Sequence, residues 1–231
     1  MSSSVRAVVF DLDGTLIDSV PDITVALNRC LATRGRAELD EESVARLVGG
    51  GARELVARAL GPETPTVEID SALADFLAAY RAEPVALTRL YHGTRELLDA
   101  LRGAGLPLAI CTNKPQDLTM LILGRLGLGA DFSVVWGGET GKPLKPDAAC
   151  LRSVCGGLGV IPAETIMVGD SLTDVDAARS AGCPVIVVAH GYERRPLDSL
   201  GADVVCAGLA DTAREISRRL ARGQSRLRWP V

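Results

Sequence analysis

Short apolar runs separated by amphipathic segments recur along most of the chain. The runs are rich in Val and Ile and lack strict alternation, so they predict strands that are buried on both faces of a parallel sheet. They cover residues 5–10, 107–111, 132–136, 165–168, 184–188 and 203–206. Helical patterns lie between them, at residues 94–102, 116–126, 147–158 and 172–180. Strands that alternate with helices in this way predict an α/β sandwich.

The stretch of residues 19–87 breaks this alternation. It carries helical patterns at residues 23–34, 41–48, 53–60 and 67–81 and no convincing strand, with Pro62 and Pro65 between the last two. We therefore predict a three-layer, Rossmann-like core of residues 1–18 and 88–231 and a helical cap of residues 19–87, inserted after the first strand. Residues 18–19 and 83–85 are the predicted hinge strands. Such a cap would cover the carboxyl ends of the strands, where ligands bind in parallel sheets.

Composition excludes several classes of protein. Hydrophobic residues make up 47% and charged residues 23%, which is typical of a globular chain and not of a disordered, collagen-like or coiled-coil one. The net charge of -4 argues against a nucleic-acid partner, and no apolar run approaches the roughly 20 residues that span a membrane. Six scattered cysteines and the absence of a secretory signal favour a reducing, cytoplasmic location.

The end of the chain is locally basic. A helix is predicted over residues 209–222, and the tail after it carries Arg226 and Arg228. Cations near the end of a helix are typical of a solvated face, and a phosphate-rich partner is the alternative interpretation.

The strongest chemical signal follows the first predicted strand, in the sequence Asp11-Leu12-Asp13-Gly14-Thr15. Side chains alternate along an extended chain, so Asp11 and Asp13 should point to the same side, and Gly14 permits a sharp turn. Two neighbouring carboxylates repel each other unless a cation or a shared proton relieves them. Carboxylate oxygens suit Mg²⁺, whereas a calcium-binding loop would need a further Glu that this segment lacks.

Other polar residues follow later strands. Asp170 comes directly after the run at residues 165–168, and Asp174 would lie in the first turn of the next helix. Thr112 and Asn113 follow another strand and offer a hydroxyl, an amide and backbone N–H groups to a phosphate at a helix start. Lys145 adds a compact positive charge, and Lys142 is the alternative phosphate ligand.

Together these residue types, in this order, predict a phosphatase that uses an aspartate nucleophile. A carboxylate that attacks phosphorus divides one difficult hydrolysis into two easier steps. A second acid protonates the leaving oxygen and then activates water, while a metal ion and a lysine offset the charge of the transferred group.

The segment from Asp11 to Ser19, the sequences Thr112-Asn113-Lys114-Pro115 and Lys145-Pro146-Asp147, and Gly169-Asp170 with Asp174 resemble the four motifs of the haloacid dehalogenase-like hydrolases. The resemblance runs from about residue 5 to residue 211, and it is closest to the bacterial phosphoglycolate phosphatases. It implies that Asp11 is the nucleophile and Asp13 the general acid and base. It also implies that Asp11, Asp13 (through its backbone carbonyl) and Asp170 bind Mg²⁺ with support from Asp174, and that Thr112, Asn113 and Lys145 hold the phosphoryl group.

The predicted cap carries a segment similar to the glycine-rich segment of that family. It contains Gly49, Gly50, Gly51 and Arg58, which we expect to contribute to substrate specificity. The expected activity is hydrolysis of 2-phosphoglycolate by a monomer or homodimer, with a small phosphorylated substrate and no membrane or nucleic-acid partner. The alternatives are a related small-molecule phosphatase, a pyrophosphatase or a phosphomutase. A non-catalytic phosphometabolite-binding protein is disfavoured because Asp11, Asp13, Lys145 and Asp170 are all present.

Overall fold

The computed structural model describes residues 5–139 and 141–221. Its centre is a six-stranded sheet in the order β5-β4-β1-β6-β7-β8, in which every neighbouring pair is parallel. The strands are β1 (Ala7–Phe10), β4 (Leu108–Pro115), β5 (Val134–Gly138), β6 (Thr165–Gly169), β7 (Val185–Val188) and β8 (Val204–Cys206). Each predicted apolar run therefore contains or overlaps a strand, and the α/β prediction is confirmed.

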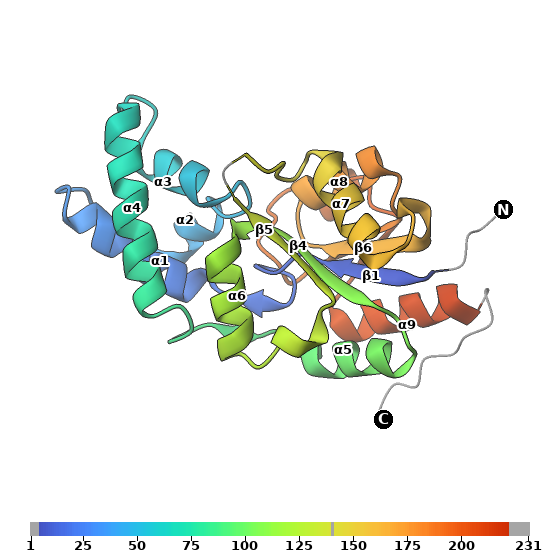
Figure 1. Cartoon of the computed structure of the whole chain (residues 1–231). Coiled ribbons are helices and arrows are strands. Elements are labelled where there is room, and N and C mark those ends of the chain that lie inside the picture. The colour runs from blue at the N-terminus through green and yellow to red at the C-terminus, as the bar shows by residue number, and fades with distance from the viewer. Residues whose placement is uncertain (1–4, 140, 222–231) are drawn as a thin grey trace.

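Helices cover both faces of this sheet (Figure 1). One face packs against α5 (Thr94–Gly103), α6 (Gln116–Arg125) and α9 (Leu209–Ala221), and the other against α7 (Ala148–Leu158) and α8 (Leu172–Ala181). Along β1, Val8 and Phe10 belong to the hydrophobic cluster on the side of α5, α6 and α9, and Val9 belongs to the cluster on the side of α7 and α8. Alternate side chains thus enter opposite layers, and all of β1 is buried, which explains its uninterrupted apolar run.

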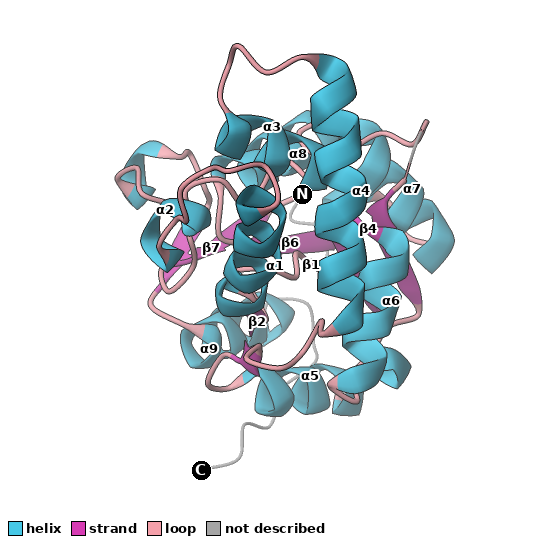
Figure 2. Cartoon of the chain, turned by 90° about the vertical axis from the view of Figure 1, so that its left-hand side faces the viewer, coloured by secondary structure: helices cyan, strands magenta, loops and turns pink. Residues whose placement is uncertain are grey.

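Four helices form a separate group at one end of the sheet: α1 (Val20–Ala32), α2 (Glu41–Ala45), α3 (Ala52–Leu60) and α4 (Thr66–Ala82). Figure 2 views the molecule from the side of this group. Three-residue 3-10 turns complete the described helices, at η1 (Gly129–Asp131), η2 (Pro162–Glu164) and η3 (Leu197–Ser199). The helical character of residues 19–87 agrees with the predicted cap, and the division of the chain into cap and core stays a proposal.

The second predicted hinge strand is wrong. Residues 83–85 do not form a strand; instead β2 (Ile17–Asp18) pairs antiparallel with β3 (Arg89–Leu90). The physical reason lies in Asp22, whose carboxylate accepts hydrogen bonds from the backbone N–H groups of Leu87 and Thr88. These donors are satisfied by a side chain, so the chain becomes a strand only after them.

Three further features bear on the sequence-based expectations. All six cysteines are buried and free of disulfides. Among the described residues, no helix has both the length and the apolar character to cross a membrane. In α9, Arg218 and Arg219 pair with Glu215, as expected for a solvated face. Arg222, Arg226 and Arg228 lie outside the described residues.

Candidate active site

A cavity of about 600 Å³ lies where the carboxyl ends of β1, β4 and β6 face the cap. It is lined on the sheet side by Asp11, Asp13, Thr112, Asn113, Lys114, Lys145 and Asp170, and on the cap side by Arg46, Gly49, Gly50, Gly51, Arg58 and Tyr80, among others. Segments from both ends of the sequence therefore meet at one place. This is the edge of the sheet at which parallel α/β folds bind ligands.

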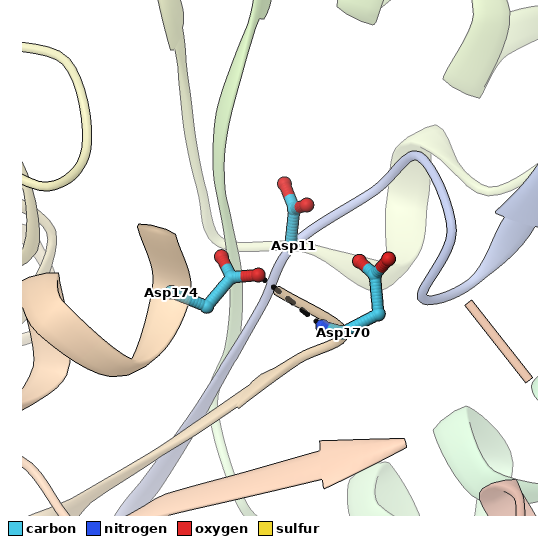
Figure 3. Close-up of side chains that lie close together, drawn as sticks. All are labelled: Asp11, Asp170 and Asp174. Carbon is cyan, nitrogen blue, oxygen red and sulfur yellow. Dashed lines mark hydrogen bonds between the residues drawn. The ribbon is translucent and has the colours of Figure 1, made fainter. Parts of the chain in front are cut away.

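Three carboxylates lie close together beside this cavity, and Figure 3 shows their side chains. Asp11, Asp170 and Asp174 each place one carboxylate oxygen within 4.8 Å of the others. Burial, together with the neighbouring acidic charges, raises the pKa of Asp11 to about 6 and that of Asp170 well above its ordinary value. The cluster thus holds more negative charge than its surroundings offset, which favours a cation.

Asp170 is fixed by contacts from two distant segments. Its Oδ1 accepts a hydrogen bond from Thr15 Oγ1 at 3.1 Å, and its Oδ2 accepts one from the backbone N–H of Tyr192 at 2.8 Å. Glycines make this approach possible, since a Cβ atom at Gly14 would lie 2.5 Å from Asp170 Oδ2 and one at Gly191 would lie 2.2 Å from Asp170 Cβ.

Lys145 is a buried cation between two of the carboxylates. Its Nζ lies 2.7 Å from Asp11 Oδ1 and 2.6 Å from Asp174 Oδ1, and its side chain is 3% exposed. Burial lowers the pKa of Lys145, but the charges of Asp11 and Asp174 outweigh this effect and raise it overall. Lys142, the alternative ligand, is 42% exposed, pairs with Glu139 and lies over the Trp136 ring. Of these two lysines, Lys145 is therefore the one that contacts the carboxylate cluster.

Asp174 positions its neighbours. Its Oδ2 accepts hydrogen bonds from the backbone N–H groups of Asp170 and Ser171 and from the Ser171 hydroxyl, while its Oδ1 contacts Lys145. Both oxygens are thus occupied, whereas Asp11 and Asp170 line the cavity. This arrangement agrees with the supporting role expected for Asp174.

Thr112 and Asn113 lie at the extended end of β4 and not at a helix start, because a local irregularity lets β4 continue to a pairing of Pro115 with Gly138. Thr112 is buried and lines the cavity. The Asn113 side chain bonds to main-chain groups: Nδ2 donates to the carbonyls of Gly49 and Lys145, and Oδ1 accepts from the N–H of Lys145. Its side chain therefore holds the main chain of Gly49 and Lys145, and the contact of Asn113 with a phosphoryl group stays a prediction.

Asp13 also lines the cavity, and its partners were not predicted. Both of its carboxylate oxygens lie 3.0 Å from Lys114 Nζ, and Oδ1 accepts a hydrogen bond from Ser19 Oγ. Lys114 in turn donates to the Tyr80 hydroxyl at 2.8 Å. The two-residue spacing of Thr112 and Lys114 on a strand could have indicated that both face the site. No pattern in the sequence indicates the contact with Tyr80.

The glycine-rich segment borders the cavity from the cap. Gly51 adopts a φ of 91°, and a Cβ atom there would lie 3.2 Å from the Asn113 carbonyl oxygen. Gly50 faces the Glu54 carboxylate, which a side chain would displace. Arg58 donates to the Arg46 carbonyl and is about half exposed. These residues lie at the cavity as expected, with Arg58 at its rim.

The acidic cluster fits a divalent cation. Asp11 and Asp170 supply oxygen donors of the type that Mg²⁺ prefers, and their raised pKa values indicate that a positive charge would be stabilised there.

Comparison with known proteins agrees with this geometry. Residues 8–188 match the family model described as haloacid dehalogenase-like hydrolase. A phosphoglycolate phosphatase of Rhodospirillum rubrum is 45% identical over 204 residues, which cover 85% of each chain. One from Chromobacterium violaceum is 41% identical and covers 90% of this chain and 94% of the relative.

Solved structures with a similar fold include further proteins of this kind. The crystal structure of a predicted phosphoglycolate phosphatase from Haemophilus somnus is 32% identical, has a TM-score of 0.86, and covers 91% of this chain and 97% of that one. The structure of CbbY from Rhodobacter sphaeroides in complex with phosphate is 27% identical, with a TM-score of 0.74 and coverages of 90% and 96%. The chain therefore belongs to the haloacid dehalogenase-like hydrolase family, in the group of its phosphoglycolate phosphatases.

Proposed function

We propose that this protein hydrolyses 2-phosphoglycolate to glycolate and inorganic phosphate through a phosphorylated Asp11. The observation that carries the proposal is the position of Asp11, whose carboxylate lines the cavity beside buried Lys145 and Asp170. A nucleophile so placed can reach a phosphate, and the cation beside it can offset the charge of the phosphoryl group.

In the first step, an Asp11 carboxylate oxygen attacks phosphorus and the bond between phosphorus and the ester oxygen breaks. Asp13 donates a proton to that oxygen, so that glycolate leaves with a neutral hydroxyl group and not as an alkoxide. In the second step, water attacks the phosphorus of the aspartyl phosphate and gives its proton to Asp13. The bond from phosphorus to Asp11 then breaks, which releases phosphate and restores both aspartates.

Mg²⁺ would be held by the carboxylates of Asp11 and Asp170 and by the backbone carbonyl of Asp13, with Asp174 in support. When bound, it supplies positive charge to the phosphoryl group. Lys145 and Thr112 would contact the phosphoryl oxygens, and Asn113 would fix the main chain of Lys145. The cap would exclude bulk water from the aspartyl phosphate.

The choice of substrate rests on the relatives and on the cavity. The relatives that match over most of their length carry the name phosphoglycolate phosphatase. A cavity closed on one side by the cap suits a small substrate. Six unpaired cysteines suit the reducing cytoplasm, where we place the protein.

Removal of the nucleophile tests the proposal. Asp11→Asn should abolish turnover of 2-phosphoglycolate, while Asp99→Asn on the exposed face of α5 should retain the wild-type rate. Comparison of kcat/KM over a panel of small phosphate esters then tests the substrate. Retained turnover in Asp11→Asn would remove the nucleophile assignment, and a clear preference for another ester would replace the substrate.

A further inference from the structure

Lys114 is a buried cation for which the proposed reaction gives no role. The chain contains three lysines among 25 basic residues, and two of them, Lys114 and Lys145, line the cavity. Lys145 serves the phosphoryl end, beside Asp11. Lys114 lies on the side of Asp13, and its side chain is only 3% exposed.

Two side chains contact the buried ammonium of Lys114, one carboxylate and one phenol. It lies 3.0 Å from both oxygens of Asp13, 2.8 Å from the Tyr80 hydroxyl and 4.6 Å from the centre of the Tyr80 ring. Burial lowers the pKa of Lys114, but the nearby charge of Asp13 and the contact with Tyr80 raise it overall, so the lysine is charged. A second carboxylate would find a desolvated cation here, where ion pairs are strong.

The position of Asp13 fixes where the leaving group must lie. To protonate the ester oxygen, the Asp13 carboxylate must come within hydrogen-bonding distance of it. In 2-phosphoglycolate a single methylene group separates that oxygen from the carboxylate. Because Lys114 Nζ contacts both oxygens of Asp13, the substrate carboxylate falls within its reach.

The other cations along the cavity are less suited to this contact. Arg46 pairs with Glu42, Arg195 pairs with Glu193, and both side chains are about half exposed. Arg194, which also lines the cavity, is exposed. Arg58 is also about half exposed, and its guanidinium is turned to the Arg46 carbonyl. Exposed ion pairs contribute little because water screens them. Of the described cations that line the cavity, Lys114 is the buried one on the side of the leaving group.

We propose that Lys114 recognises the carboxylate of the leaving group and thereby selects phosphate esters of small 2-hydroxy acids over uncharged esters of equal size. This inference rests on the proposed function and names the residue that gives it specificity. In the complex the ammonium is shared between Asp13 and the substrate carboxylate. Tyr80, at the end of α4, holds the lysine from the side of the cap.

The test compares two substrates of matched length: 2-phosphoglycolate and 2-hydroxyethyl phosphate, in which a hydroxymethyl group replaces the carboxylate. Wild type should show a kcat/KM at least about tenfold higher for 2-phosphoglycolate. Lys114→Met should reduce this preference by about 10- to 100-fold, the usual value of a hydrogen bond to a charged group. Lys142→Met is the matched control, since it removes the same charge outside the cavity and should keep the wild-type preference.

The outcomes separate a role in recognition from a role in positioning Asp13. Equal losses on both esters in Lys114→Met would show that the lysine only positions Asp13 and would overturn the inference. A wild type without preference between the two esters would overturn it as well, independently of how that variant folds. Lys114→Arg, which keeps the charge, should retain more of the preference than Lys114→Met. Absence of any turnover of 2-phosphoglycolate by wild type would overturn the proposed function, and the Lys114 assignment with it.

Discussion

The side-chain amide of Asn113 bonds to the main chain of Lys145 in both directions. Its Nδ2 donates to the Lys145 carbonyl at 2.9 Å, and its Oδ1 accepts from the Lys145 N–H at 2.8 Å. The same Nδ2 also donates to the Gly49 carbonyl in the cap, at 2.9 Å. One amide thus connects the cap, the end of β4 and the backbone of the buried lysine.

Asn113→Asp should therefore impair catalysis, because a carboxylate cannot donate to the two carbonyls and would repel them. Asn28→Asp is a matched control, since Asn28 makes the same pair of bonds to the main chain of Leu39, away from the cavity. Each substitution should lower the free energy of unfolding by about 1–3 kcal/mol, as expected for unsatisfied polar groups. Only Asn113→Asp should also lower kcat/KM by more than about tenfold, measured on 2-phosphoglycolate. Equal activity in the two variants would contradict the positioning role.

Asp174→Asn tests the buried pair with Lys145. The substitution removes one of the two carboxylates that contact buried Lys145, and Asp11 remains as the other. We therefore expect a loss of about 1–3 kcal/mol of stability, the range for a hydrogen bond to a charged group. Asp176→Asn, on the exposed side of the same helix, should change the free energy of unfolding by less than about 0.5 kcal/mol. Denaturant unfolding of both variants measures the difference. A small effect of Asp174→Asn would mean that this pair does not stabilise the loop.

Gly51→Ala and Gly61→Ala separate backbone strain from function. Gly51 precedes α3 and Gly61 follows it. Their backbone angles are nearly the same, at φ 91° and ψ 167° for Gly51 and φ 99° and ψ 160° for Gly61. The strain of about 1–3 kcal/mol should thus be similar in the two variants. A methyl group at position 51 also approaches the Asn113 carbonyl, whereas one at position 61 meets nothing within 4 Å. Gly51→Ala alone should therefore change the ratio of kcat/KM for 2-phosphoglycolate to that for an aryl phosphate.

Stability of the metal-free protein should fall as the pH rises through about 6. Burial raises the pKa of Asp11 from an unfolded value near 3.8 to about 6, so the folded state favours the protonated acid and loses this contribution at higher pH. Mg²⁺ offsets the charge and should raise the melting temperature more at pH 7.5 than at pH 5. Thermal unfolding with Mg²⁺ and with a chelator measures both effects. In Asp11→Asn, the rise in melting temperature caused by Mg²⁺ should differ less between pH 7.5 and pH 5. In the wild type, an equal rise at both pH values would contradict the metal site.

Much of this architecture follows from local pattern. Apolar runs indicated β1 and β6 because both faces of those strands are buried. The apolar pattern does not predict the polar end of β4, since its strand conformation comes from pairing with β5 after the apolar run has ended. The hinge strand at Arg89–Leu90 was misplaced for a similar reason, because Asp22, far away in sequence, determines where pairing begins.

The candidate site likewise contains residues that local pattern predicts and contacts that it does not predict. The places of Asp11 and Asp170 directly after strands predict that they meet at one edge of the sheet, and the structure brings them together. Tyr80 has the spacing of an ordinary core residue on an amphipathic helix, and its contact with Lys114 depends on how α4 meets the sheet. Such contacts between distant segments arise from tertiary packing and leave no local pattern in the sequence.

Tyr192 connects Asp170 with the start of the first helix. Its backbone N–H holds Asp170, and its hydroxyl accepts from the N–H of Ser19, where the chain enters α1, and donates to Asp18 in β2. The backbone and the side chain of this one residue therefore contact both the carboxylate cluster and the segment in which the chain passes from β2 into α1. The position of Asp170 is thereby tied to the point where α1 begins, in a segment from the other end of the chain.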